Sequence, residues 1–280
     1  MEKIYEIYLV SDSTGETLDR IFLALQAQFL NFKYKSHQYA FTRTENQIMK
    51  IFISIVIIAG MVTASFAGDL TGTVTYEGKA SKKKKLRMDS DPVCSAAHQD
   101  AVYSERFIVD ENGNLANVIV YLKSASSDSA PSEAAIIDQN GCMYTPHVFG
   151  MQAGQELKIL NSDPTMHNIH GLPKLNKEFN FGMPKTVKEK SVTFHKAEDV
   201  FVIKCDVHPW MKSYVQVFDH PYFAVTGTDG KYSISGISAG EYEVVAWQEK
   251  FGSKRTMVQT VTIGDDSTTL DFKFIKPSKK

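Results

Sequence analysis

The chain has 280 residues, of which 22% are charged, and its formal net charge is −1 at pH 7. This composition is typical of a globular protein with room for two modest domains. The near balance of Lys+Arg (31) and Asp+Glu (32) gives no support for nucleic-acid binding, so we expect no nucleic-acid partner. The one basic run, residues 82–85, is interpreted as a solvated loop.

The first 48 residues have an α/β pattern. Residues 3–12 read as a strand, residues 13–30 as an amphipathic helix and residues 37–41 as a second strand. The motif YLVSDSTGET resembles the start of the bacterial regulatory proteins of phosphoenolpyruvate synthase and pyruvate phosphate dikinase, which are kinase/phosphotransferases. Since the rest of that catalytic domain is absent, we interpret residues 1–48 as a truncated fragment from a fusion or a mis-started reading frame.

Residues 49–67 have the pattern of a secretory signal peptide. A short positive start at Met49-Lys50 precedes an apolar run over residues 51–62, and the small residues Ser65 and Ala67 follow at the positions that a signal peptidase requires. Cleavage after Ala67 would export the protein to the periplasm or the medium. The alternatives are a buried core helix or a membrane anchor, and a membrane partner is expected only if the segment stays uncleaved.

From residue 68 onward the pattern changes to β structure. Short alternating or β-branched segments are separated by Gly, Asn, Asp and Pro, which favours a sandwich or barrel. The predicted strands are residues 70–78, 117–123, 155–163, 190–195, 200–206 and 213–219. We therefore predict a mostly β fold, with one domain over residues 68–220 and a second over residues 221–280.

The second domain repeats the pattern of short strands and turns. Its motif DGKYSISGISAGEYEV resembles the small sandwich of carboxypeptidase regulatory-like (transthyretin-like) domains. That resemblance implies a structural or interaction module with no catalytic set.

The segment IKCDVHPWM places Cys205, His208 and Met211 within seven residues, between two predicted strands. A buried cysteine, a surface histidine and a core methionine would give the same letters without a metal. His167, which follows an upstream strand and turn, offers a fourth ligand. Two imidazoles, one thiolate and a weak thioether are the blue-copper set, whereas zinc prefers tetrahedral sets without a thioether.

The segments MHNIHG and IKCDVHPWM resemble the cupredoxin family, especially the short ligand loop of amicyanin and secreted bacterial cupredoxin-domain proteins. The resemblance implies a Greek-key cupredoxin sandwich and one type 1 copper held by His167, Cys205, His208 and Met211. It also implies that Asn168 ties the two ligand loops together, with its backbone N–H near the Cys205 sulfur.

Other histidines and cysteines compete with this assignment. His170 is a rival to the upstream ligand histidine, and His98 and His147 are either structural or a second metal site. Cys94 and Cys142 are expected to pair in a disulfide if the third cysteine binds metal, because an oxidising compartment favours pairing; the alternative is that they are ligands.

The predicted function is a periplasmic single-electron carrier, which is not an enzyme and has no small-molecule substrate. A redox protein is expected to dock near His208, Pro209 and Trp210, because in cupredoxins the edge of the C-terminal histidine reaches the surface inside an apolar patch. One alternative is a copper-binding metallochaperone or storage protein without electron transfer. Another, drawn from residues 1–48, is a phosphotransferase regulator.

Overall fold

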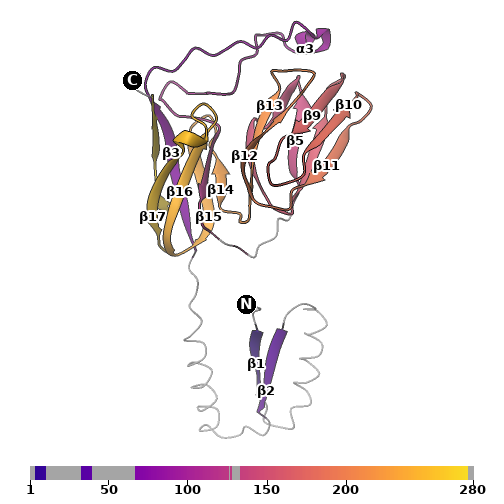
Figure 1. Ribbon diagram of the computed structural model, residues 1–280. Coiled ribbons are helices and arrows are strands. Elements are labelled where there is room, and N and C mark those ends of the chain that lie inside the picture. The colour runs from indigo at the N-terminus through magenta and orange to yellow at the C-terminus, as the bar shows by residue number, and fades with distance from the viewer. Residues whose placement is uncertain (1–3, 11–32, 40–66, 126, 128–132, 277–280) are drawn as a thin grey trace. The chain divides into compact units, whose positions relative to one another are not determined.

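The computed structural model describes residues 4–10, 33–39, 67–125, 127 and 133–276 (Figure 1). The chain divides into two compact units, Met1–Ala64 and Ser65–Lys280. Strands make up most of the described regular structure, so the predicted mostly β fold is confirmed. Among the described residues, no helix is long and apolar enough to cross a membrane.

The first unit contains two parallel strands, β1 (Ile4–Val10) and β2 (Lys33–Tyr39). The predicted first strand is confirmed. The second strand begins four residues earlier than predicted. The prediction missed this start because the segment KYKS lacks the alternating apolar residues that mark a strand. The predicted helix over residues 13–30 lies outside the described residues, as does the signal-like segment except for its last residue.

Nine strands between residues 135 and 218 build the first sheet pair, which carries the predicted ligands. They are β5 (Ala135–Asn140), β6 (Met143–Thr145), β7 (Val148–Gln152), β8 (Glu156–Asn161), β9 (His167–Gly171), β10 (Phe179–Met183), β11 (Glu189–Thr193), β12 (Glu198–Lys204) and β13 (Lys212–Phe218). One sheet has the order β10-β9-β12-β13-β7 and the other β11-β8-β5-β6. Apolar side chains from both sheets form one buried cluster, which includes Ile159, Ile169 and Val215.

The second sheet pair combines strands from both ends of the second unit. They are β3 (Ala67–Glu77), β4 (Val118–Leu122), β14 (Phe223–Val225), β15 (Lys231–Ser238), β16 (Gly240–Gln248), β17 (Met257–Ile263), β18 (Thr268–Thr269) and β19 (Phe272–Ile275), with a 3-10 helix at Ser253–Arg255. One sheet has the order β14-β4-β16-β17, and in the other β3 pairs with β15, β18 and β19. A second buried cluster, including Leu70, Val120 and Phe272, fills this pair.

The strand pairing of the second sheet pair crosses the predicted domain boundary at residue 220. We expected residues 68–220 to form one domain and residues 221–280 another, but β3 pairs with β15 and β4 pairs with β14 and β16. The strands themselves lie where the sequence predicts them. Alternation marks a strand and its buried face but not its partner, and these partners are more than 100 residues apart in the chain.

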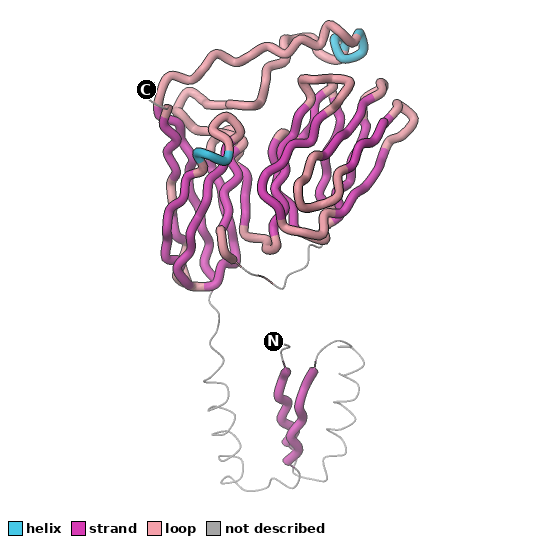
Figure 2. Tube along the Cα trace, in the orientation of Figure 1, coloured by secondary structure: helices cyan, strands magenta, loops and turns pink. Residues whose placement is uncertain are grey.

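Between β3 and β4 the chain forms a long loop with one short helix, α3 (Pro92–Ala96), drawn at the top of Figure 2. We call residues 85–103 the strap. Its two arms are joined by hydrogen bonds, including one from the Leu86 N–H to the Val102 carbonyl. Met88 and Cys94 of the strap are buried in the core cluster of the first sheet pair. The strap therefore brings residues from the front of the chain onto the sheets that carry the ligands.

Candidate metal centre

The upstream ligand candidate begins an interior strand of the five-stranded sheet, between β10 and β12. His167 is the first residue of β9 and is fully buried. Strand β9 pairs with the C-terminal end of β12, where Lys204 lies opposite His170. This antiparallel register carries the chain after Lys204 toward the start of β9, so Cys205 and His167 meet although 38 residues separate them in sequence.

The downstream candidates lie on a tight loop between β12 and β13. The Cys205 N–H donates to the Met211 carbonyl at 3.2 Å, and the Met211 N–H donates to the His208 carbonyl at 2.9 Å. A further N–H, from His208, approaches the Cys205 sulfur at 3.3 Å. All three side chains are buried, and Met211 is fully so. The loop is thus held by its own backbone between two strands.

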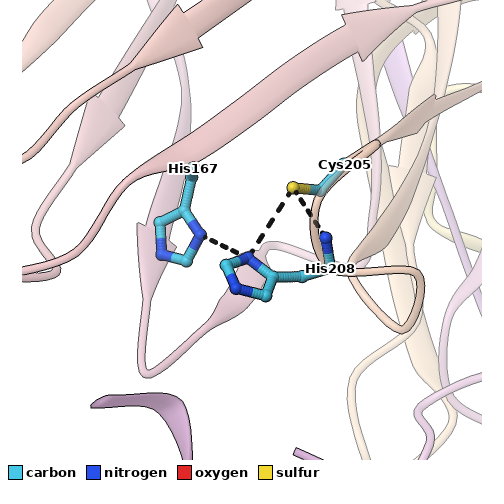
Figure 3. Close-up of side chains that lie close together, drawn as sticks. All are labelled: His167, Cys205 and His208. Atoms are coloured by element: carbon cyan, nitrogen blue, oxygen red, sulfur yellow. Dashed lines mark hydrogen bonds between the residues drawn. The ribbon is translucent and has the colours of Figure 1, made fainter. Parts of the chain in front are cut away.

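Three ligand atoms converge in this buried group (Figure 3). The Nδ1 atoms of His167 and His208 lie 3.0 Å apart, and the Cys205 sulfur lies 3.8 Å from Nδ1 of His208. Metal-ligand bonds of about 2.0–2.3 Å place nitrogen and sulfur donors roughly 3–4 Å from one another, so this donor set fits a metal ion. Met211 belongs to the same core cluster as Cys205. The structure therefore brings His167, Cys205 and His208 to one place, and Met211 is a buried residue of the same loop.

In each candidate ligand histidine, Nε2 faces a carboxylate that the sequence analysis did not identify. Nε2 of His167 lies 2.8 Å from Asp163, and Nε2 of His208 lies 3.0 Å from Asp91. Both aspartates precede a proline, in the segments DPTMH and DPVC. That repeated Asp-Pro placement, just ahead of a ligand or a half-cystine, is the signal that was available.

Hydrogen bonds within the buried group shift the pKa values of His167 and Cys205 in opposite directions. Burial disfavours the charged form of His167, but hydrogen bonds with Asp163 and Cys205 outweigh burial and raise the pKa of His167 to about 9. Burial also opposes ionisation of Cys205, yet hydrogen bonds from His167 and from the backbone amides of Asn168 and His208 lower the pKa of the thiol. The same hydrogen bonds thus raise the pKa of His167 and lower the pKa of the Cys205 thiol. Binding of a metal cation to such a pair would release any proton that the ligand atoms hold.

Asn168 connects the two ligand segments. Its side-chain oxygen accepts the Asp206 N–H at 3.0 Å, and its amide group donates to the Phe181 carbonyl at 3.3 Å. Tyr144, a fully buried residue that we did not single out, donates its hydroxyl to the Asn168 carbonyl at 2.5 Å. The expected link between the loops is thus present, and a buried tyrosine supports it.

The competing histidines lie in other environments. His170 points its two ring nitrogens at Asp206 and Glu178, at 2.9 and 2.8 Å. His147 bonds the Lys212 carbonyl and Glu249, and His98 bonds the Gly141 carbonyl. None of the three is in a group of potential ligands found among the described residues.

Cys94 and Cys142 form a disulfide, as predicted, and Cys205 is the free cysteine. The disulfide covers the imidazole ring of His208, which we expected at the surface. His208 is only 2% exposed, and its Nε2 lies 3.7 Å from the Cys94 sulfur. The expectation of a bare histidine edge is wrong, because the strap packs over it.

The fold and the donor set define a β-sheet protein with a buried candidate metal centre of two imidazoles and one thiolate. A family described as kinase/pyrophosphorylase matches residues 7–88. The putative pyruvate, phosphate dikinase regulatory protein of Pelagibacter ubique is 67% identical over 51 residues, which are 18% of this chain and 19% of that protein. The protein of the same description from Hyphomonas neptunium is 41% identical over 58 residues, 21% of each chain. The chain thus spans about a fifth of these relatives, and the N-terminal resemblance is confirmed for that segment.

Solved structures similar to this chain include copper proteins. The Cu-containing nitrite reductase (NirK) from Thermus scotoductus SA-01 matches with a TM-score of 0.29 and 16% identity, covering 35% of this chain and 25% of that one. Amicyanin from Paracoccus versutus matches with a TM-score of 0.27 and 21% identity, covering 35% and 96%. The case for copper therefore depends on the ligand residues and their geometry.

Proposed function

We propose that the chain is a type 1 copper protein that carries single electrons. His167, Cys205 and His208 would hold one copper ion, with Met211 as a weak axial ligand. The observation that carries this proposal is the convergence of two Nδ1 atoms and one cysteine sulfur in a buried group.

The donor set suits a metal that changes its charge. Copper bound there would cycle between Cu(I) and Cu(II). Thiolate and thioether ligands favour Cu(I), whereas imidazole also accommodates Cu(II). The loop from Cys205 to Met211 is held between two strands by backbone hydrogen bonds, so the ligands move little when the charge changes. Such a centre performs no bond chemistry, and the proposal assigns neither an enzyme activity nor a small-molecule substrate.

The proposal includes an architecture and a location. The first sheet pair would be a Greek-key cupredoxin sandwich. The second would be a transthyretin-like sandwich assembled from residues 67–122 and 222–276. Export to the periplasm or the medium is supported by the signal-like pattern of residues 49–67 and by the disulfide, since disulfides persist in oxidising compartments. No kinase activity is proposed, because the N-terminal match covers about a fifth of its relatives.

A redox protein is the proposed partner, docking near His208, Pro209 and Trp210. Pro209 is exposed and Trp210 half-buried, so both are accessible to a partner. His208 is not, and an electron leaving through its ring would pass Asp91 or the disulfide in the strap.

The test is a visible spectrum of the full chain with one equivalent of Cu(II), before and after ascorbate. An electron carrier gives an intense thiolate-to-Cu(II) band that bleaches on reduction and returns on oxidation. Cys205→Ala and His167→Gln should each abolish the band. His170→Gln is the matched control and should retain it, because His170 bonds only acidic side chains near the surface.

A colourless chain that still binds copper would support the storage or chaperone alternative instead. An unchanged band in Cys205→Ala would refute the ligand set.

A further inference from the structure

Each of the two proposed ligand imidazoles is hydrogen-bonded to a carboxylate through Nε2. Nε2 of His167 lies 2.8 Å from Oδ2 of Asp163, and Nε2 of His208 lies 3.0 Å from Oδ2 of Asp91. An ionised carboxylate only accepts hydrogen bonds, so Nε2 of each ring carries the proton. Each Nδ1 is then the atom available to bind a metal, and the two Nδ1 atoms are the ones that face each other.

The Asp91 carboxylate is itself held in place by backbone amides. Its Oδ1 accepts the N–H groups of Val93 and Cys94, at 2.8 and 3.2 Å. The residue caps the short helix α3, which fixes the carboxylate within the strap. The hydrogen bond from His208 lowers the pKa of Asp91, so its charge is present at neutral pH.

The Asp163 carboxylate is held in the same way by the other half of the disulfide. Its Oδ1 accepts the Gly141 N–H at 2.7 Å, and its Oδ2 accepts the Cys142 N–H at 2.8 Å. Since Cys142 is bonded to Cys94, one disulfide joins the two segments that fix the two carboxylates. Both carboxylates are therefore positioned by covalent and backbone contacts that do not depend on the metal.

Carboxylates in this position affect the metal as well as the rings. A carboxylate that accepts a hydrogen bond from a ligand imidazole makes the imidazole a stronger donor and adds negative charge close to the metal. That charge stabilises a divalent ion more than a monovalent one, because the attraction grows with the charge of the ion.

We propose that Asp91 and Asp163 are positioning residues that orient both imidazoles and bias the centre toward Cu(II) over Cu(I). This inference rests on the proposed copper function. It goes beyond the ligand set, because it assigns the selection of oxidation state to two residues that do not touch the metal.

The test compares Asp91→Asn and Asp163→Asn with the unmodified full chain. Asparagine keeps the shape and one acceptor oxygen but removes the charge. The dissociation constants of Cu(II) and of Cu(I) are measured separately, by competition with chelators specific for each ion. Each variant should weaken Cu(II) binding on the order of 10–100-fold, the usual effect of losing such a partner, and should weaken Cu(I) binding by a smaller factor. Each tenfold difference between the two factors corresponds to a rise of about 59 mV in the reduction potential.

Asp89→Asn is the matched control, because Asp89 is an exposed residue of the same strap. It should change neither constant. Asp91→Glu restores the charge and should recover part of the Cu(II) preference. Asp91 is 22% exposed at its side chain, so Asp91→Asn should fold even if Asp163→Asn does not.

The outcomes separate this inference from the proposed function. A chain that binds neither copper ion refutes the proposed function itself. Copper binding with equal weakening of both ions, or with none, overturns the inference alone, because a purely structural role does not discriminate between the ions.

Discussion

Removing the disulfide is the sharpest test of how the strap is held. Cys94 and Cys142 are 48 residues apart in sequence, and both are buried. Cross-linking a loop of that length lowers the entropy of the unfolded chain by an amount worth about 4 kcal/mol at 25 °C. The double variant Cys94→Ala, Cys142→Ala should therefore lose about 4 kcal/mol of unfolding free energy. Alanine avoids leaving a buried hydroxyl without a partner.

The assay is urea unfolding of the metal-free chain at constant pH, followed by tryptophan fluorescence. Trp210 is a local reporter, since its indole N–H donates to the Cys142 carbonyl at 3.0 Å. The m-value should rise in the double variant, because an unfolded chain without the cross-link exposes more surface. Cys205→Ala is the matched control, because it removes a buried sulfur without opening a loop.

The reasoning fails if the double variant loses no more stability than Cys205→Ala does. That result would mean that the segment between the half-cystines stays ordered in the unfolded chain, so that the cross-link restricts little.

Three further predictions concern the proposed axial ligand, an acid-sensitive histidine and a close backbone contact. Met211→Leu should retain copper and raise the reduction potential in a redox titration, since a weak thioether contact tunes the centre; loss of all copper would contradict the axial role. Burial lowers the pKa of His220, whose neutral ring accepts the Tyr222 N–H. The unfolding free energy should therefore fall as the pH drops below about 6.5, where the unfolded chain binds the proton more readily, and His220→Gln should flatten that fall in urea titrations. Gly72→Ala would place a methyl group 1.9 Å from the Leu270 carbonyl oxygen, so calorimetry should report a loss of about 2–3 kcal/mol.

The sequence predicts the local features of this protein well. Alternation located β8, β12 and β13 to within two residues, because a strand with one buried face repeats every second residue. Cys205, His208 and Met211 were found together because one short loop carries them all. The odd cysteine count pointed to the disulfide, since it left one thiol for a different role.

The distant contacts did not follow from the sequence in the same way. Asp91 reaches His208 across 117 residues, through a strap whose path depends on pairing in the second sheet pair. Strand β3 shows its buried face in the pattern of Leu70 and Val74, but nothing local says that β15 is its partner. Each of these features depends on contacts between segments that are far apart in the chain.

The strap changes what the proposed centre can do. A ligand histidine with a bare edge would give its metal a short route to a partner but also access to water. Here the ring of His208 is covered by Asp91 and the disulfide, and both sulfur atoms lie in residues that are 1% exposed or less. Electron transfer through the strap remains compatible with this arrangement, because the contacts from Nε2 to the carboxylate and to Cys94 are 3.0 and 3.7 Å. Direct access of an external chelator to a metal bound there is not compatible with this arrangement, because the strap would first have to move. The strap would therefore favour retention of a metal bound at the proposed centre, and the disulfide ties the strap to the segment of Cys142.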